Sequence, residues 1–267
     1  LEILDTAERL LPVANGDVYA PLLQGKVLGN LFFENSTRTR MSFESAMKRL
    51  GGEVVNLSSV GSSVAKGETL YDTMQMVDGY SDIAVIRHPR QGAAQYSADA
   101  IGIPILNAGD GAGNHPTQTM LDLFTIRQAH GTLDGLNVVL VGDLRYGRTT
   151  HSLSHALARF GAKLTLVSPD SLRMPTEIVG DLQSHDTEVI ESEDLSGSIA
   201  DADVIYMTRI QKERFPDEDE YAKVAGIYKM TADNLAEAKG GMIVMHPLPR
   251  VDEIDPSVDS TKHARYF

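Results

Sequence analysis

The chain contains no cysteine among its 267 residues. Disulfide bonds, thiol nucleophiles and thiolate zinc sites are therefore excluded in this chain. The sequence also lacks an uninterrupted apolar run long enough to cross a bilayer. Residues 1–10 carry acidic groups where a secretory signal would carry basic ones. We therefore expect a soluble, cytoplasmic protein with no membrane partner, whose chemistry comes from side chains other than cysteine.

Positive charge is also in short supply. The 24 Lys and Arg residues are outnumbered by 37 Asp and Glu residues, which gives a formal net charge of -13 at pH 7. The average field of such a chain repels polyanions, which argues against general binding to nucleic acid or to an acidic membrane. If the ligand is a small anion, a local group of Arg and Lys side chains must overcome this background.

Apolar segments alternate with amphipathic ones along the chain. Strands are predicted at 26–33, 53–57, 83–87, 103–109, 136–143, 162–169, 187–192, 203–209 and 240–249. Helices are predicted between some of these strands, at 41–50 and at 149–160. One face of the first helix carries Phe43, Ala46, Met47 and Leu50. This rhythm is typical of parallel sheets flanked by helices, whose ligands bind beyond the carboxyl ends of the strands.

A long helical pattern at 116–131 separates two such alternating regions. Pro116 suits the first turn of this helix, and Gly131 suits its end. We therefore predict an α/β protein of two domains, residues 1–130 and 131–267, each a parallel sheet flanked by helices. The acidic stretch 214–220, which contains a proline, is predicted to be an exposed loop rather than a linker.

Hydroxyl and guanidinium groups crowd the turn between the first predicted strand and the helix that follows it. Ser36, Thr37 and Thr39 can donate hydroxyl hydrogen bonds, and the planar guanidinium of Arg38 matches phosphate oxygens. The free N–H groups and the dipole of a helix N-terminus also attract an anion. The segment therefore has the composition of a phosphate cradle, although a capped helix with a solvent-facing arginine explains the same residues equally well.

Further polar residues follow other strands of the first region. Arg87 stands at the end of the strand predicted at 83–87, and His115 and Gln118 lie at the start of the helix at 116–131. These are positions on the ligand-binding edge of a parallel sheet. His115 and Gln118 are about one helical turn apart and can direct two hydrogen-bond donors the same way, although a single histidine such as His115 more often has a structural role.

The segment 141–153 forms a strand, a turn and a helix, an order that is typical of a dinucleotide site. Its glycines are wrongly spaced for that motif, however, and residues 144–146 are bulky where a pyrophosphate needs close approach. We therefore expect no dinucleotide. Arg148, Arg209, Gln211 and the rigid segment 246–250 indicate a carboxylate-binding edge instead.

One pair of histidines has the spacing of metal ligands on a helix. His151 and His155 are four residues apart, but the glutamate of the HExxH motif is missing. A plain helix face is therefore favoured over a metal site. No metal and no other cofactor is predicted.

Taken together, these motifs resemble those of the aspartate carbamoyltransferase family, in order and over nearly the whole chain. The matching segments are 32–44, 62–73, 86–89, 106–126, 141–153, 206–214 and 246–254. Ornithine carbamoyltransferases share the cradle motif and an HPxQ-type segment, but they usually lack the equivalent of Lys66 and carry a cysteine in the equivalent of 246–250. The resemblance implies two domains, for carbamoyl phosphate (1–130) and for aspartate (131–267), with the active site in the cleft between them.

The same resemblance implies an activity and partners. Family members transfer the carbamoyl group of carbamoyl phosphate to the amino group of L-aspartate, giving N-carbamoyl-L-aspartate and phosphate for de novo pyrimidine biosynthesis. They need no cofactor, and their catalytic chains form homotrimers. The sequence leaves open whether a separate regulatory chain also binds. The alternatives are transfer to ornithine or another amine, and an inactive scaffolding relative.

Site residues are implied by position in the matching motifs. Carbamoyl phosphate would be bound by Ser36, Thr37, Arg38, Thr39, Arg87, His115 and Gln118. The aspartate side would be completed by Arg148, Arg209, Gln211, Leu248 and Pro249. Ser62 and Lys66 would enter the site of a neighbouring subunit, and Glu34 would pair with Arg148 and Arg214 to hold a closed state. The catalytic residues among these would be Arg38, Thr39, Lys66, Arg87 and His115.

Overall fold

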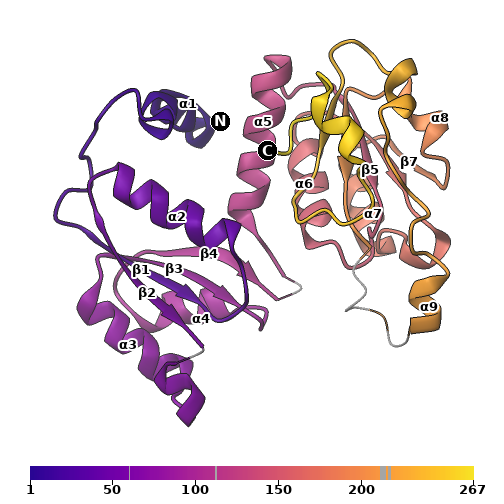
Figure 1. The fold of residues 1–267 in the computed structure, drawn as a ribbon. Helices are drawn as coiled ribbons and strands as arrows, with labels where there is room; N and C mark the ends of the chain where they lie inside the picture. Colours follow the sequence, from indigo (N-terminus) through magenta and orange to yellow (C-terminus); the bar gives the residue numbers. More distant parts are fainter. Residues whose placement is uncertain (60, 112, 211–214, 216–217) are drawn as a thin grey trace. The chain divides into compact units, whose positions relative to one another are not determined.

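The structure is a computed structural model that describes residues 1–59, 61–111, 113–210, 215 and 218–267. The chain divides into two compact units, Leu1–Thr117 and Gln118–Phe267 (Figure 1). Helix α5, Pro116–His130, begins at the end of the first unit and runs into the second. Each unit is built on a parallel sheet flanked by helices, so the predicted α/β fold class is confirmed.

The first unit contains a four-stranded sheet in the order β2-β1-β3-β4. Its elements are α1 (Glu2–Asn15), β1 (Val27–Phe32), α2 (Arg38–Arg49), β2 (Glu53–Ser58), the 3-10 helix η1 (Ser63–Lys66), α3 (Leu70–Tyr80), β3 (Ile83–His88), α4 (Ala93–Ala100) and β4 (Ile105–Asp110). All three strand pairings are parallel. The four strands predicted in this region are therefore confirmed.

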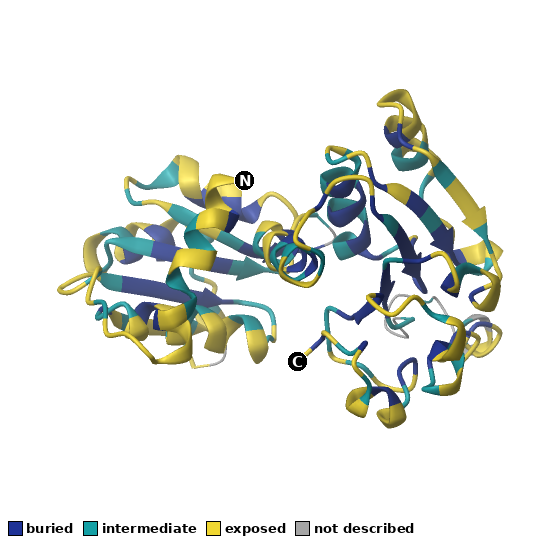
Figure 2. Ribbon diagram, turned by 90° about the horizontal axis from the view of Figure 1, so that it is seen from above, coloured by how far each residue is buried: buried dark blue, intermediate teal, exposed yellow. Residues whose placement is uncertain are grey.

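The two faces of this sheet pack against different helices, because successive side chains of a strand point to opposite faces. On one face Leu31 packs with Met74 of α3 and Ala94 of α4. On the other face Leu28 packs with Met47 of α2. The central strands are thus covered on both sides, as the arrangement of the helices and the dark blue of the strands show (Figures 1 and 2).

The apolar face predicted for the helix at 41–50 is only partly buried. Met47 is buried and Phe43 packs against the same core cluster, but Ala46 is exposed. Ala46 lies about 100° around the helix from Met47, outside the narrow stripe that faces the sheet. The helix also begins earlier than predicted, at Arg38.

The second unit contains a five-stranded sheet in the order β7-β6-β5-β8-β9, with all pairings parallel. Besides α5, its elements are β5 (Asn137–Val141), α6 (Arg148–Ala158), β6 (Lys163–Val167), η2 (Asp170–Leu172), α7 (Thr176–Ser184), β7 (Val189–Ser192), α8 (Ser196–Ile199), β8 (Val204–Met207), α9 (Glu218–Ala222), η4 (Asp233–Glu237), β9 (Ile243–Met245) and η5 (Pro256–Ser260). The remaining five predicted strands are therefore confirmed. The core is built around Val139, Val141, Ile205 and Val244.

The loop predicted at 214–220 is wrong from Glu218 onward, where the chain forms the short helix α9. Acidic residues are frequent in exposed loops, but they are also favoured in the first turn of a helix, where they interact with its dipole. Residues 211–214, 216 and 217 lie outside the described part of the chain.

Each sheet has one point at which the order of its strands reverses. The chain passes from β1 outward to β2 and then returns to β3 on the other side of β1; it passes likewise from β5 through β6 and β7 to β8. Ligands of open parallel sheets bind beyond the carboxyl ends of the strands at such points. The two positions of interest are therefore the ends of β1 and β3 and the ends of β5 and β8. Within the described ranges, no helix combines the length and the apolar character needed to span a membrane.

Candidate active site

The turn after β1 leads directly into an open helix N-terminus. The Phe33 N–H donates to the carbonyl of Arg87 at 2.9 Å, which ties the end of β1 to the end of β3. Helix α2 then begins at Arg38, and its N-cap residue Thr37 makes no capping side-chain hydrogen bond to the described residues. The N–H groups of the first turn are therefore available to an anion, and no acidic residue in that turn opposes it.

The predicted cradle residues lie together at this N-terminus. Thr37 and Arg38 are exposed, while Ser36 and Thr39 are half-buried. The hydroxyls and the guanidinium thus belong to one turn of chain at the carboxyl edge of the sheet. This placement favours the cradle over a simple helix cap, because the cap hydrogen bond that the simpler explanation requires is not made by Thr37 within the described chain.

Arg87 stands beside this turn, because β1 and β3 pair with Phe32 opposite Arg87. Its side chain is only 12% exposed, and it donates to Glu34 Oε1 at 3.0 Å and to the Ala108 carbonyl at 3.3 Å. Its buried Nε has no hydrogen-bond partner among the described residues. A buried N–H without an acceptor costs about 1–3 kcal/mol. A bound phosphate oxygen would supply an acceptor.

The loop after β4 carries His115. Asp110 shapes this loop by accepting hydrogen bonds from the N–H of Gly92 at 2.8 Å and of Asn114 at 2.7 Å. Gly111 adopts a φ of 56°, and a Cβ at that position would overlap the Pro89 carbonyl, so the loop requires glycine there. His115 is buried and follows the strand that neighbours β3.

Gln118 begins a buried polar network in the first turn of α5. Its Nε2 donates to Asp122 Oδ1 at 3.0 Å, and Asp122 Oδ2 accepts a hydrogen bond from the Tyr206 hydroxyl at 2.8 Å. Burial raises the pKa of Asp122 to about 7 and that of Tyr206 well above its usual value. Asp122 and Tyr206 are not among the site residues that the sequence indicated. The available signal was an acid in the helix that begins at Pro116, with apolar residues on both sides of it.

The arginines predicted at the second sheet lie at its switch point. Arg148 is the first residue of α6, after β5, and Arg209 follows β8, which pairs with β5. Both side chains are half-buried. Gln211 and Arg214 lie outside the described residues. The predicted pairing of Glu34 with Arg148 and Arg214 stays a prediction, while the Glu34 carboxylate contacts Arg87 within the first unit.

Leu248 and Pro249 follow β9 in a turn that a buried acid and a histidine support. Leu248 has a φ of 55°, a conformation that is unfavourable for a branched side chain. Its N–H donates to His246 Nδ1 at 2.7 Å, and His246 Nε2 donates to Glu253 Oε1 at 2.6 Å. Burial opposes the charge of Glu253, but hydrogen bonds from His246 and from backbone N–H groups lower its pKa to about 2. Sequence reasoning missed this support.

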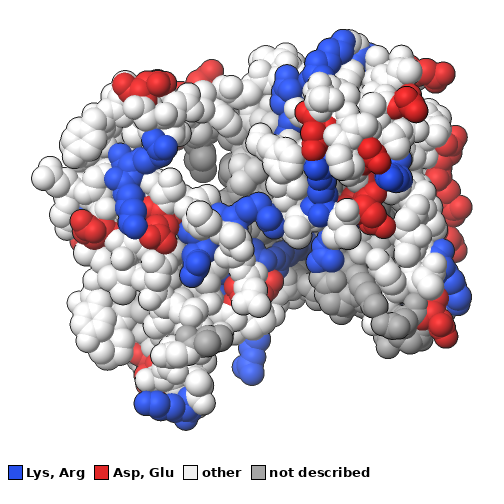
Figure 3. All heavy atoms as spheres, viewed as in Figure 1, with Lys and Arg blue, Asp and Glu red and all other residues white. Residues whose placement is uncertain are grey.

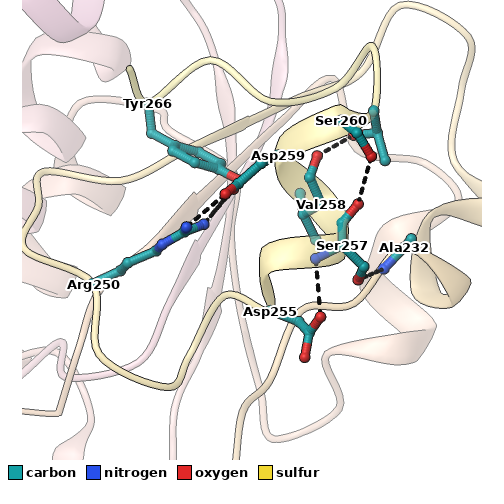
Figure 4. Close-up of polar contacts among 9 residues, drawn as sticks. Ala232, Arg250, Asp255, Ser257, Val258, Asp259, Ser260 and Tyr266 are labelled. Atoms are coloured by element: carbon teal, nitrogen blue, oxygen red, sulfur yellow. Dashed lines mark hydrogen bonds and ion pairs between the residues drawn. The ribbon is translucent and has the colours of Figure 1, made fainter.

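A second set of contacts holds the chain just beyond this turn (Figure 4). Arg250 donates through both terminal nitrogens to Asp259, and the Tyr266 hydroxyl donates to the same carboxylate at 2.5 Å. The Arg250 guanidinium also lies over the Tyr266 ring, 5.5 Å from its centroid. Hydrogen bonding to Arg250 lowers the pKa of Asp259. The turn at Leu248 is therefore anchored on both sides.

Ser62 and Lys66 lie in the segment after β2, an edge strand of the first sheet. Ser62 Oγ donates to the Ser59 carbonyl at 3.2 Å, and Lys66 is exposed in the last turn of η1. The hydrogen bond of Ser62 is local and does not link it to the cradle of its own chain. The predicted role of Ser62 and Lys66 in a neighbouring subunit stays a prediction.

The histidines considered as metal ligands have separate partners. His151 Nε2 donates to the Leu144 carbonyl at 2.7 Å, whereas His155 Nδ1 lies 3.3 Å from Asp181 Oδ2. In the part of the chain that the structure describes, no group of three or more potential ligand residues could hold a metal ion.

Figure 3 shows Lys and Arg side chains gathered locally on the face in view, although the net charge is -13.

Two family models match the chain in order. Residues 1–128 match the carbamoyl-phosphate-binding domain of aspartate/ornithine carbamoyltransferases, and residues 134–267 match their aspartate/ornithine-binding domain. The aspartate carbamoyltransferase catalytic subunit of Archaeoglobus fulgidus is 58% identical over 99% of this chain and 88% of its own length. That of Thermococcus kodakarensis is 56% identical over 99% of this chain and 86% of its own.

Solved structures agree with the sequence comparisons. The catalytic subunit of aspartate transcarbamoylase from M. jannaschii superimposes with a TM-score of 0.92 at 50% identity, over 99% of this chain and 87% of the other. Aspartate transcarbamoylase from Trypanosoma cruzi, in complex with N-(phosphonacetyl)-L-aspartic acid, gives a TM-score of 0.92 at 42% identity, over 99% of this chain and 85% of the other. By the match of both domain models and by these relatives, the chain belongs to the aspartate/ornithine carbamoyltransferase family.

Proposed function

We propose that this chain transfers the carbamoyl group of carbamoyl phosphate to the α-amino group of L-aspartate. One observation carries the proposal within the family. The N-terminus of α2, which Thr37 does not cap within the described residues, and the buried guanidinium of Arg87, whose Nε has no partner there, both lie at the switch point of the first sheet. Such an arrangement favours a bound phosphate group. Aspartate as the acceptor is supported by relatives named for that substrate.

Carbamoyl phosphate binding would use the residues at the carboxyl edge of the first sheet. The N–H groups of α2, the hydroxyls of Ser36, Thr37 and Thr39, and Arg38 would neutralise the phosphate charge. Arg87 and His115 would lie toward the carbonyl oxygen, and Gln118 toward the carbamoyl nitrogen. Binding of this kind places a reactive anion in a fixed position, which is the main contribution that a protein makes to such a transfer.

The reaction itself needs no protein nucleophile. The neutral amino nitrogen of aspartate attacks the carbonyl carbon, and the carbonyl π electrons move onto oxygen. Thr39, Arg87 and His115 donate hydrogen bonds to this developing oxyanion. The carbon–oxygen bond to phosphate then breaks as the carbonyl re-forms, and the departing phosphate takes the proton that the amino group loses.

The aspartate side is assigned to the second unit. Arg148, Arg209 and Gln211 would bind the two carboxylates, with Leu248 and Pro249 completing the site. Structures of the Trypanosoma cruzi relative contain carbamoyl phosphate and aspartate together, which supports the same pair of substrates here. Arginine suits this role because its planar group binds a carboxylate through two hydrogen bonds.

The assembly belongs to the same proposal. The chain would act in the cytoplasm as a homotrimer, in which Ser62 and Lys66 from one subunit enter the site of the next, and it would serve pyrimidine biosynthesis. The exposed position of Lys66 beyond an edge strand supports this role. A separate regulatory chain would be an additional partner, and co-purification with such a chain is its direct test.

A panel of amine acceptors tests the proposed function. Purified chain is incubated with carbamoyl phosphate and, separately, with L-aspartate, L-ornithine or L-glutamate, and the carbamoylated product is identified by mass. N-carbamoyl-L-aspartate should form at a rate far above that of the other products. Preferential carbamoylation of ornithine would establish the alternative transferase, and product from none of the amines would favour the inactive scaffold.

A further inference from the structure

The network around Asp122 reaches beyond the residues assigned to substrate. Gln118 and Asp122 are four residues apart on α5, so their side chains share one face of the helix. Asp122 is 2% exposed and Tyr206, on β8, is fully buried. The two carboxylate oxygens of Asp122 each accept one hydrogen bond, from Gln118 Nε2 and from the Tyr206 hydroxyl.

This arrangement determines which end of the Gln118 amide faces away from Asp122. Above its raised pKa of about 7, the Asp122 carboxylate is ionised and only accepts hydrogen bonds, so the NH₂ group of the amide must face it. The Tyr206 hydroxyl occupies the second oxygen and lies within hydrogen-bonding reach of Gln118 as well. The carbonyl oxygen Oε1 of Gln118 is then left as an acceptor for a ligand.

We propose that Asp122, held by Tyr206, is a positioning residue that fixes the Gln118 amide so that Oε1 accepts a hydrogen bond from the amino group of the acyl phosphate. The network thereby selects carbamoyl phosphate over acetyl phosphate, which carries a methyl group in place of the amino group. This inference rests on the proposed function in that it takes carbamoyl phosphate as the ligand of Gln118.

The cost of this network supports a functional role. Burying a carboxylate is unfavourable, and the two partners that hold Asp122 are neutral donors, an amide and a phenol. An apolar residue of similar size would pack at lower cost in a buried position. A buried acid here fixes the orientation of the Gln118 amide and lowers the stability of the fold, a trade that is common at functional sites.

Selection by an oriented acceptor is also physically effective. A site built to hydrogen-bond an N–H group leaves its acceptor unpaired when a methyl group takes that place, and such sites reject the analogue strongly. If the amide rotated freely, its NH₂ group would face the ligand part of the time. The discrimination between the two acyl phosphates would then be smaller.

The test uses equilibrium binding of both acyl phosphates at pH 8, where Asp122 is ionised, measured by calorimetry, with kcat/KM measured beside it by phosphate release. Asp122→Asn places an NH₂ group in the network, so either orientation of Gln118 is satisfied. We expect the preference for carbamoyl over acetyl phosphate to fall about tenfold, through weaker carbamoyl phosphate binding. In Asp122→Leu, whose new side chain has neither donor nor acceptor, the same preference should fall at least tenfold.

A second comparison separates positioning from a purely structural role. In a Gln118→Ala background, Asp122→Asn should cause no further loss of carbamoyl phosphate affinity, because its effect acts through Gln118. Additive losses would overturn the inference. Asp203→Asn is the matched control. Asp203 is also an acid of the second unit, but it lies before β8 and pairs with Lys239 at 2.8 Å, so its loss should leave the preference unchanged.

The outcomes also distinguish this inference from the proposed function. If both Asp122 variants fold and keep the wild-type preference, or if the wild-type chain shows no preference, the inference is wrong even where aspartate is carbamoylated. If ornithine proves to be the acceptor, the proposed function is wrong, and the ratio of the two acyl phosphates still tests the role of Asp122.

Discussion

At the scale of single residues, Arg38 is an exposed part of the candidate phosphate site, so its substitution can be tested with little risk to the fold. We predict that Arg38→Ala lowers kcat/KM for carbamoyl phosphate by about a hundredfold, because a charge-assisted hydrogen bond to phosphate is worth about 3 kcal/mol. Arg40→Ala is the control. Arg40 is exposed on the same helix but about 200° around its axis. Steady-state kinetics of both variants would refute the cradle if Arg38→Ala kept wild-type values.

Asp122 gives a second residue-scale prediction, in which stability depends on pH. Burial raises its pKa from 3.8 to about 7, so the folded state holds a proton that the unfolded state releases between these pH values. Stability therefore falls as pH rises from about 4 to 7, by up to about 4 kcal/mol. Asp122→Asn removes this titration. Thermal denaturation should show the variant gaining stability relative to wild type between pH 5 and pH 8; a difference that does not change with pH would contradict the buried, titrating acid.

At the scale of elements, the turn after β9 depends on Glu253, whose pKa is shifted in the opposite direction. Its pKa is lowered from 4.5 to about 2, so it stabilises the fold by about 3 kcal/mol above its unfolded pKa. That contribution is lost as the pH falls from about 4.5 to 2. Glu253→Gln should therefore destabilise the chain at pH 7 but little at pH 2.5.

The control for this variant is an exposed acid of the same unit. Glu188 pairs with Lys163 at 3.0 Å on the surface, and such a pair contributes little. Denaturant unfolding at both pH values should show almost no effect of Glu188→Gln. Equal effects of the two substitutions would mean that the contacts among His246, Leu248 and Glu253 do not stabilise the turn.

The elements also show how much of the fold could be predicted from the sequence. The nine strands were predictable because each is an apolar run between polar segments. The helical pattern places the start of α2 at 41, three residues later than its observed start at Arg38. Contacts between distant segments could not be predicted in this way. The hydrogen bond between Asp122 and Tyr206 joins residues 84 positions apart, and no local pattern specifies it.

The same limit applies to the turn after β9 and to α2. The positive φ of Leu248 depends on how His246 and Glu253 hold the backbone after β9, which residue type alone does not reveal. The exposure of Ala46 depends on the width of the stripe that α2 presents to the sheet. Periodicity locates the face of a helix but not its buried width.

At the scale of the whole molecule, the proposed trimer predicts that inactive variants restore one another. Arg38→Ala and Lys66→Ala chains are each expected to be inactive, and they are mixed under conditions that allow subunits to exchange. If Lys66 acts in a neighbour's site, random mixing in a cyclic trimer should restore roughly a quarter of the sites. If Lys66 acts in its own chain, every site keeps one defect. No recovery, with exchange confirmed by mass, would remove Ser62 and Lys66 from a shared site.

We propose that residues after β1, β3 and β4 bind the phosphate end of the reacting pair, while residues after β5, β8 and β9 bind its aspartate end. N-(phosphonacetyl)-L-aspartate carries both ends in one compound, so its calorimetric titration is the most direct test. We predict one compound bound per chain, far more tightly than phosphate or aspartate alone, with an affinity loss of about a hundredfold for either Arg38→Ala or Arg209→Ala. If the compound bound no tighter than phosphate, or if either substitution left its affinity unchanged, these two groups of residues would not bind the two ends of the substrate pair.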